Sequence, residues 1–366
     1  MNFFKLNRQL SDSASQLDPL DGLRGFAALL VVISHASIKG MFPVPAVDLR
    51  GLGRPGVYLF FLLSAFLLTL ALLRKSSSLL SAPVMINYWL RRFLRIYPLY
   101  ILYLLFAVIC TKYVDPSKPI IFDLDVDGFM NHLLLQEGKD VTWSIAVEFK
   151  FYFVLPVLTL LFSAISSRSM KALVGSVAVV LVALQLFNSQ IRAFSEDTGL
   201  SQYMTFFVLG MLLAVIQSRM GEQFAQKENA NKLMRVLGYL GLAGIVIMTP
   251  VVYSKFGAHV HRTHFHNQHL LYAVCWSAVL MAAVNVPGGI QKFFSMPVLR
   301  FYGGLSFGVY LFHPVFVSLA IALGVGLKLG FWFVLASSTI CALVAFKMLE
   351  QPLSKIGVGR TNPPVS

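Results

Sequence analysis

An arginine and a histidine lie in the first apolar segment of the chain, in the run LDPLDGLRGFAALLVVISHAS. Arg24 and His35 are eleven positions apart, and on an α-helix eleven steps of about 100° return nearly to the same face. We therefore expect both side chains on one side of the helix, about 16 Å apart along its axis. Ionisable side chains are costly at such a depth in a bilayer and are kept mainly for pathways or chemistry. The pair predicts a functional site inside a membrane-spanning segment.

A second polar stripe occurs in the run TWSIAVEFKFYF, where Ser144, Glu148 and Tyr152 follow one another at intervals of four residues. Side chains at this spacing share one face of a helix. The expected topology places Glu148 at a depth similar to that of His35, and a carboxylate that orients an imidazole makes a general base. The stripe therefore predicts a catalytic pair of His35 and Glu148. The alternative is a hydrogen bond that only packs two helices.

A cluster of three arginines occurs in the run NYWLRRFLRIYP, as Arg91, Arg92 and Arg95. We expect an amphipathic stretch on the cytoplasmic side that ends at Pro98, where the next span begins. Guanidinium groups suit phosphate, because each can grip two oxygens. The cluster predicts a phosphate-binding site. The alternative is anchoring to anionic lipid headgroups.

Two further apolar runs carry polar side chains that could line a cavity. The run GVYLFFLLSAFLLT contains Ser64, and the run LSFGVYLFHPVF contains Ser306, Tyr310 and His313 on one helical stripe. Pro314 is expected to bend or loosen the helix beside His313. Both runs predict a substrate cavity, and helix packing is the alternative for each.

Five histidines alternate in the loop FGAHVHRTHFHNQH, as His259, His261, His264, His266 and His269. Alternating histidines can bind a metal. No acidic or cysteine ligand accompanies them, and a solvated, pH-sensitive loop is the favoured interpretation. We assign no metal site.

Composition predicts an all-α membrane protein. Of the 366 residues, 57% are hydrophobic and only 13% are charged, which is too apolar for a soluble domain. The long unbroken apolar runs are typical of helices and not of a transmembrane β-barrel. Cys110, Cys275 and Cys341 each stand alone in an apolar run, so they indicate neither a disulfide framework nor a metal site.

About ten apolar runs are long enough to form transmembrane helices, and lysines and arginines are more frequent in the connecting segments on the side of the N-terminus. Both termini are therefore expected in the cytoplasm, and the net charge of +14 indicates topology and not nucleic-acid binding. The runs are 20–38, 56–73, 97–114, 143–165, 170–188, 199–217, 233–253, 270–286, 302–323 and 330–348.

The domain organisation is expected to be simple. Residues 1–16 are predicted to form a disordered cytoplasmic tail, residues 17–350 one membrane domain, and residues 351–366 a short cytoplasmic tail. The basic start resembles a signal peptide, but Asp18, Asp21 and Arg24 interrupt the apolar run, so we expect the first span to be retained.

The ordered set of motifs resembles the membrane acyltransferase 3 family, which includes bacterial O-acetyltransferases of surface polysaccharides and related macrolide-sugar acyltransferases. The resemblance extends from about residue 17 to residue 355 and depends on all the motifs together. They are LDGLRGFAALLVVISHA, GVYLFFLLSAFLL, RRFLRIYP, TWSIAVEF, YLFHP and LEQPLSK.

The resemblance implies a membrane enzyme that transfers an acyl group from cytoplasmic acyl-CoA to a carbohydrate hydroxyl on a cell-surface or lipid-linked glycan. Acetyl is the commonest acyl group in such proteins, acyl-CoA acts as a donor substrate and not as a bound cofactor, and the membrane is the cytoplasmic (inner) one. The family's essential residues fall on Arg24, His35, Glu148 and the pair Arg92 and Arg95.

Two positions add to this comparison. Ala65 replaces the glycine usual after Ser64, which puts a close backbone approach there in doubt. Glu350 matches the acidic position before the terminal proline, where the family implies a structural ion pair on the cytoplasmic side.

The resulting hypothesis places the coenzyme A phosphates at Arg91, Arg92 and Arg95 and threads the pantetheine arm past Arg24 towards His35. Arg24 would stabilise negative charge, and His35 would either deprotonate the acceptor or carry the acyl group. A secondary transporter or flippase is the alternative from another class, and a non-catalytic scaffold is a third. A small glycosylated metabolite is the alternative acceptor.

Overall fold

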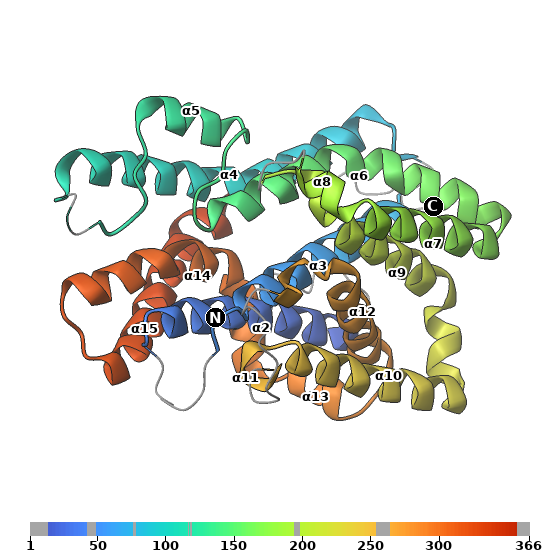
Figure 1. The fold of residues 1–366 in the computed structure, drawn as a ribbon. Coiled ribbons are helices and arrows are strands. Elements are labelled where there is room, and N and C mark those ends of the chain that lie inside the picture. The colour runs from blue at the N-terminus through green and yellow to red at the C-terminus, as the bar shows by residue number, and fades with distance from the viewer. Residues whose placement is uncertain are drawn as a thin grey trace.

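The computed structural model describes residues 14–41, 49–75, 78–115, 117, 119–193, 198–253 and 264–356, and within them the chain forms helices and no strand (Figure 1). The helices in the first half are α2 (Ala14–Ile38), α3 (Gly53–Leu73), α4 (Ala82–Tyr113), α5 (Val126–Leu133), α6 (Thr142–Arg168), α7 (Met170–Leu186) and α8 (Asn188–Ala193). Those in the second half are α9 (Leu200–Gln226), α10 (Glu228–Ile247), α11 (Pro250–Tyr253), η3 (His264–Asn267), α12 (His269–Asn285), α13 (Gly289–Phe294), α14 (Pro297–Ala322), α15 (Leu327–Ala345), the π-helical turn η4 (Phe346–Glu350) and α16 (Gln351–Leu353).

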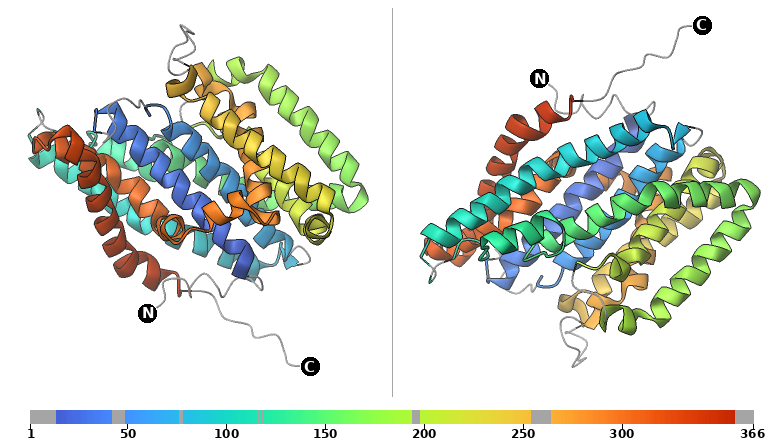
Figure 2. Two further views of the ribbon diagram at one scale, coloured as in Figure 1. Left: turned by 90° about the horizontal axis from the view of Figure 1, so that it is seen from below. Right: turned by 90° about the horizontal axis from the view of Figure 1, so that it is seen from above.

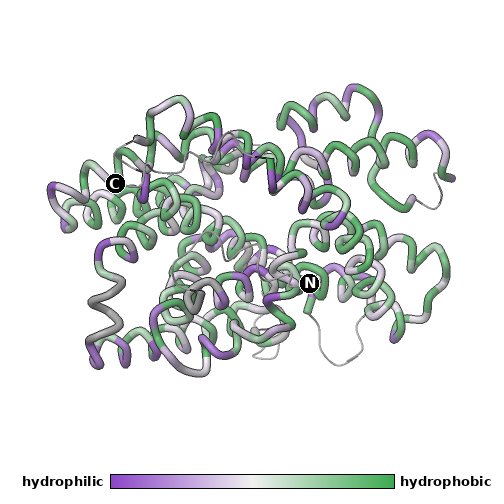
Figure 3. Tube along the Cα trace, turned by 180° about the vertical axis from the view of Figure 1, so that it is seen from behind, coloured by the Kyte–Doolittle hydropathy of each residue, from purple (hydrophilic) through white to green (hydrophobic). Residues whose placement is uncertain are grey.

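The helices form a polytopic membrane bundle, as composition predicts (Figure 2). Each of the ten predicted apolar runs is largely helical, although the run 233–253 is divided between α10 and α11 and the run 330–348 extends from α15 into η4. Eight of the described helices are long and apolar enough to cross a bilayer. The other two, α7 and α12, have 17 residues each, which is about 25 Å of helix. Hydrophobic residues dominate the long helices (Figure 3), and outward-facing side chains such as Val157, Leu240 and Ile340 are more than half exposed, as lipid contact requires.

The prediction that Pro98 ends an amphipathic stretch is wrong. Helix α4 runs for 32 residues without a break, so the arginine cluster and the following apolar span belong to one helix, with Pro98 inside it. A proline removes one backbone donor and crowds the preceding turn, but transmembrane helices tolerate it where neighbours take up the freed carbonyl. Pro314 likewise lies inside the continuous helix α14.

Glycines bring α2 and α14 into backbone contact. A Cβ atom at Gly25 would lie 1.9 Å from the carbonyl oxygen of Leu299, and one at Gly303 would lie 2.0 Å from that of Asp21. Only glycine fits at such a crossing, and close approach of this kind is how helices associate in lipid. At the same crossing Asp18 and Arg300 form an ion pair of 2.7 Å. We call this contact the glycine seam of α2 and α14.

The start of α6 is positioned by a buried histidine in the preceding segment. His132 is fully buried, its Nδ1 donates to the carbonyl of Gly128 at 2.8 Å, and its Nε2 accepts from the backbone N–H of Lys139 at 3.0 Å. Tyr100 on α4 donates to the carbonyl of His132. These bonds join α4, α5 and the turn before α6, and so they position the stripe of Ser144, Glu148 and Tyr152. The sequence analysis did not single out His132.

The glycine seam predicts a strong stability effect at Gly303. We expect Gly303→Ala to destabilise the protein by about 1–3 kcal/mol or more, because an overpacked backbone contact must separate. The measurement is the thermal unfolding midpoint of the purified protein in detergent. Gly175→Ala is the matched control, because a Cβ atom at that helical glycine meets nothing within 4 Å. Equal midpoints for the two variants would contradict the prediction.

The buried hydrogen bonds of His132 predict that the stability of the folded protein falls at acid pH. Burial lowers the pKa of His132 below its ordinary value of 6.5, so the unfolded chain takes up a proton that the folded protein resists. This contribution to stability is therefore complete above pH 6.5 and is lost as the pH falls. We expect His132→Leu to cost about 1–3 kcal/mol at pH 7.5 and less at pH 5, measured by unfolding at both pH values. A difference that does not shrink at pH 5 would contradict the prediction.

Candidate active site

A cavity of about 320 Å³ lies inside the bundle and is lined by polar side chains from α2, α3, α4, α6 and α14. Arg74, Arg92 and Arg95 are among its lining residues, and Arg74 directly follows the last residue of α3. His35 lies beside Gly53, the first residue of α3. Gly53 and Arg74 are about 30 Å apart along the axis of this helix. We call the two ends of this site the arginine end (Arg74, Arg92 and Arg95) and the histidine end (His35 and His313).

Glu148 is the centre of a polar cluster inside the cavity. Its Oε1 atom accepts hydrogen bonds from Ser64 at 2.6 Å and from Tyr152 at 2.5 Å. These bonds join α3 to α6, and the i, i+4 spacing of Glu148 and Tyr152 produces the contact within α6 that the sequence predicts. The guanidinium groups of Arg24 and Arg92 interact electrostatically with this carboxylate. A partly buried carboxylate is thereby paired with hydroxyl donors and with cations.

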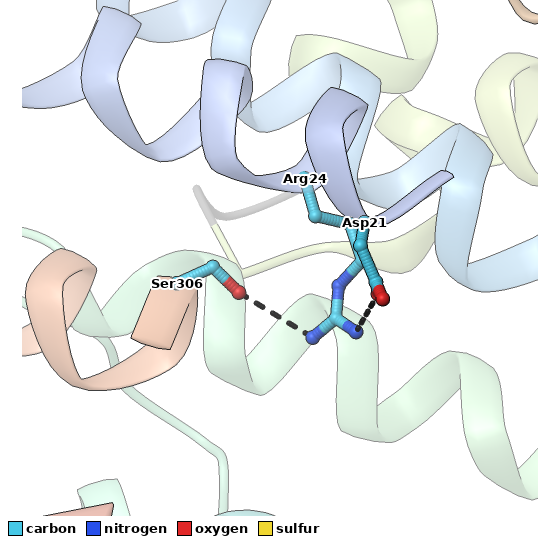
Figure 4. A network of polar contacts seen from close by, with 3 residues as sticks. All are labelled: Asp21, Arg24 and Ser306. Carbon is cyan, nitrogen blue, oxygen red and sulfur yellow. Dashed lines mark hydrogen bonds and ion pairs between the residues drawn. The ribbon is translucent and has the colours of Figure 1, made fainter. Parts of the chain in front are cut away.

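Arg24 is held by residues on both sides of the glycine seam. Its guanidinium donates to Ser306 of α14 at 3.4 Å and lies 4.0 Å from the carboxylate of Asp21, one turn earlier on α2 (Figure 4). All three side chains line the cavity. Arg24 therefore presents a positive charge to the cavity in a fixed orientation.

The arginine cluster of α4 divides between the cavity and the surface. Arg92 and Arg95 line the cavity, and the Nε atom of Arg92 is buried without a hydrogen-bond partner. Arg91 is exposed, donates to Asn87 at 3.2 Å and does not line the cavity. The structure therefore does not bring Arg91 into the cavity with Arg92 and Arg95. Arg91 and Arg92 are adjacent and point about 100° apart on the helix.

The structure does not pair His35 with Glu148. The Nδ1 atom of His35 lies 2.7 Å from Nε2 of His313, and the two ring centroids are 4.8 Å apart. The contacts of Glu148 go to Ser64 and Tyr152 instead. The predicted His35–Glu148 couple is corrected for a simple reason: similar depth in the membrane does not place two residues on facing sides of their helices.

His313 does not line the cavity, contrary to the prediction from its stripe. Its side chain is completely buried, whereas Ser306 and Tyr310 of the same stripe do line the cavity. The ring of Tyr310 is 6.0 Å from that of His313, so Tyr310 is the lining residue that connects the cavity to the histidine pair. His35 is also absent from the cavity lining.

Ser144 and Tyr310 join α6 to α14 beside the histidine end. Their hydroxyl oxygens are 2.7 Å apart, and each hydroxyl also has the carbonyl of Val141 in hydrogen-bond range, at 3.1 and 3.0 Å. Both line the cavity, as do Ser64 and Tyr152. Sequence spacing alone places each stripe on one helical face, and the structure brings the two stripes together.

Some lining residues were missed by the sequence analysis. Asp21, Arg74 and Gln217 all line the cavity. The i, i+3 spacing of Asp21 and Arg24 is a local signal that could have found the first. Arg74 carries only the topology signal that it shares with the other basic residues of the connecting segments. Nothing in the sequence around Gln217 distinguishes it from a solvated helix end.

Three remaining predictions concern residues outside this cluster. Glu350 lies within electrostatic range of Arg95 and Arg24, beside the arginine end. Ala65 packs closely against Gly210 of α9, so the close backbone approach is provided by the partner helix. His259 and His261 lie outside the described residues, and His269 is buried against Tyr58 and Phe206. Among the described residues no group of three or more potential metal ligands comes together.

Chemically, the cavity combines a cationic end, where the Nε atom of Arg92 has no hydrogen-bond partner, with a central carboxylate–hydroxyl cluster and, beyond Tyr310, a pair of imidazoles. Such a cavity can accept an anionic ligand at the arginine end. The histidine end can accept or deliver a proton.

Comparison with known proteins shows what the chain is similar to. The family described as an acyltransferase domain matches residues 18–347. The "Putative O-acetyltransferase" of Staphylococcus aureus (strain COL) is 24% identical over 373 residues, covering 94% of this chain and 58% of the relative. The "Peptidoglycan O-acetyltransferase OatA" of Listeria monocytogenes is 23% identical over 381 residues, covering 96% of this chain and 58% of the relative.

A third relative is the "Acyltransferase MdmB" of Streptomyces mycarofaciens, which is 29% identical over 231 residues and covers 55% of this chain and 57% of that protein. The chain thus spans less than two thirds of the length of the curated relatives that it matches. No solved structure gives a significant match.

The orphan Nε of Arg92 predicts anion binding at the arginine end. We expect inorganic pyrophosphate to bind the purified protein and Arg92→Gln to weaken binding about tenfold or more, because a charge-assisted hydrogen bond is worth about 1.5–3 kcal/mol. Isothermal titration calorimetry measures both. Arg91→Gln is the matched control, because Arg91 lies outside the cavity and should leave the affinity unchanged. Equal losses in the two variants would indicate nonspecific attraction.

Proposed function

The chain belongs to the acyltransferase family whose domain matches residues 18–347, and from this premise we propose that it is an integral-membrane O-acyltransferase. The reaction moves an acyl group, acetyl in the simplest case, from acyl-CoA to a hydroxyl of a carbohydrate acceptor. The observation that carries the proposal is the cavity that begins at Arg92 and Arg95, continues past Arg24 and Glu148, and reaches Tyr310 beside the histidine pair.

The arginine end suits the phosphates of acyl-CoA. Arg92 has an unsatisfied buried donor, and Arg95 shares its helical face. Phosphate oxygens would complete these hydrogen bonds, with the acyl-CoA as a substrate that comes and goes. On this proposal the arginine end faces the cytoplasm and both termini lie there, which agrees with the distribution of positive charges along the chain.

Arg24 is suited to stabilise the thioester during transfer. Negative charge develops on the thioester oxygen when a nucleophile attacks it, and a fixed cation inside a low-dielectric cavity stabilises that charge strongly. Ser306 and Asp21 hold the guanidinium so that little reorganisation is needed. Glu148 balances the charge of Arg24 and Arg92 and orients Ser64 and Tyr152, in place of the role with His35 that the sequence suggested.

His35 accepts the proton of the acceptor hydroxyl in this proposal. As that proton moves to the imidazole, the hydroxyl oxygen forms a bond with the acyl carbon and the carbon–sulfur bond of the thioester breaks. The departing thiolate takes up one proton, so that the products are an ester and coenzyme A. In an alternative order, His35 first takes the acyl group from the thioester and then passes it to the acceptor hydroxyl, so that a bond between His35 and the acyl carbon forms and breaks in two steps.

The name of one relative supports the proposed acceptor. One relative is named as a peptidoglycan O-acetyltransferase, and its name supports a glycan acceptor in the cell envelope for this chain. We propose a cell-surface or lipid-linked glycan, reached from the histidine end, and a location in the cytoplasmic membrane. A small glycosylated metabolite is the alternative acceptor.

A transporter without group transfer would also need a cavity between charged residues. Reconstituted protein separates the two classes, because an acyltransferase consumes acyl-CoA in proportion to the ester formed. Solute movement with no release of free coenzyme A would support the transporter. Mass spectrometry of envelope glycans from cells with and without the protein identifies the ester.

We expect His35→Ala to lower acyl transfer by about 10²–10⁴-fold, the usual contribution of a general base. The measurement is ester-linked label in an envelope-glycan fraction after incubation of proteoliposomes with labelled acetyl-CoA. Binding of coenzyme A should persist, because the arginine end lies far from His35. Full transfer by a variant that still binds coenzyme A would rule out His35 as the proton acceptor.

A further inference from the structure

We infer that His313 is a positioning residue that holds His35 as the tautomer with its proton on Nδ1, which leaves Nε2 of His35 as the atom that takes the acceptor's proton. The inference rests on the proposed function and deepens it. It is carried by a chain of hydrogen bonds that begins at a proline and ends at the reactive ring.

The first link is the carbonyl that Pro314 leaves free. In a regular helix the N–H of residue 314 would donate to the carbonyl of Tyr310, but proline has no N–H. The Nδ1 atom of His313 lies 2.7 Å from that carbonyl oxygen and 3.3 Å from the carbonyl oxygen of Val309. A carbonyl oxygen can only accept, so the proton of the His313 ring is on Nδ1.

The second link follows from the first. A neutral imidazole carries one ring proton, so Nε2 of His313 is an acceptor. Its partner at 2.7 Å is Nδ1 of His35, which must therefore donate. The opposite assignment would leave two unprotonated nitrogens facing each other with no proton between them, or would place an imidazolium at His313, whose side chain is completely buried. His35 thus carries its proton on Nδ1.

The third link is the free nitrogen of His35. With Nδ1 protonated, Nε2 has an unshared electron pair, which is what a general base or a nucleophile needs. Nε2 faces Gly53, where a Cβ atom would lie 3.8 Å away. Ser34 accepts from the backbone N–H of Gly51 at 3.1 Å and so fixes the approach to α3 beside the ring. Because residue 53 is a glycine, it adds no side chain next to this nitrogen.

In this arrangement His313 orients the imidazole of His35 and fixes its tautomer, as a carboxylate does in many catalytic pairs. When Nε2 of His35 takes the hydroxyl proton, the ring becomes an imidazolium whose Nδ1–H still donates to the neutral His313. The acyl carbon gains the hydroxyl oxygen and loses the sulfur of the donor. The thiolate then accepts one proton, and His35 returns to its Nδ1–H form when it gives up the proton from Nε2.

Two substitutions at position 313 separate this role from simple packing. In His313→Gln the amide oxygen can still accept from Nδ1 of His35, whereas His313→Leu fills the space without an acceptor. We expect His313→Leu to lower kcat by at least about 10²-fold with an unchanged KM for acetyl-CoA, because a wrong tautomer disables a general base while donor binding lies elsewhere. His313→Gln should recover at least tenfold of that loss. Equal kcat values for the Gln and Leu variants would overturn the inference.

The tautomer itself can be measured without any activity. Nitrogen-15 NMR of the ¹⁵N-histidine-labelled protein distinguishes a protonated from an unprotonated ring nitrogen. The signal lost in His35→Gln should show a protonated Nδ1 and an unprotonated Nε2, and His313→Leu should release this preference. A protonated Nε2 on His35 of the wild-type protein would overturn the inference.

A third variant tests the role of the proline and covers the case in which position 313 tolerates no change. Pro314→Ala restores an N–H that competes for the carbonyl of Tyr310, so we expect a lower kcat and a mixed tautomer signal for both histidines. A pure wild-type signal in this variant would contradict the first link. These readouts distinguish the proposed acyltransferase function from the proposed role of His313. Wild-type protein that shows the expected tautomer but transfers no acyl group would contradict the function and not the hydrogen-bond chain.

Discussion

Backbone contact between α2 and α14 is the constraint on which the rest of the site depends. The glycines at positions 25 and 303 let the two helices approach until side chains at the crossing have no room. That approach brings Arg24 to Ser306, and further along the same two helices it brings His35 to His313. In lipid the hydrophobic effect does not drive helices together, because the lipid tails are as apolar as the helix surfaces. Close packing and polar contacts of this kind stabilise the bundle instead. The seam is therefore both the structural core and the scaffold of the chemistry.

The electrostatics of the cavity follow from burying guanidinium groups that cannot give up their charge. A partly buried cation needs anions nearby, and Asp21, Glu148 and Glu350 supply them around Arg24 and Arg92, whereas Arg95 is exposed. The balance is incomplete, because the Nε atom of Arg92 has no partner. This unsatisfied donor is the observation from which anion binding at the arginine end is proposed.

The two ends of the site have different chemical characters, and Tyr310 is where they meet. The arginine end is cationic and lines a cavity, whereas the histidine end is a neutral hydrogen-bonded pair outside that cavity. Tyr310 lines the cavity, contacts the ring of His313 and supplies the carbonyl that fixes its proton. This separation keeps the imidazoles away from the cations that would disfavour a protonated ring, so proton transfer and anion binding can coexist in one bundle.

The amino-acid sequence by itself determined the fold class, the apolar helices and the faces on which polar residues recur, because these depend on helical periodicity and on the length needed to cross a bilayer. It placed Ser144, Glu148 and Tyr152 on one stripe and Ser306 and Tyr310 on another. Only the tertiary structure decided which stripes face each other. Glu148 of α6 pairs with Ser64 of α3, and His35 of α2 pairs with His313 of α14. Helix rotation and crossing are set by small residues far apart in the chain, such as Gly25 and Gly303, whose contact no local pattern reveals.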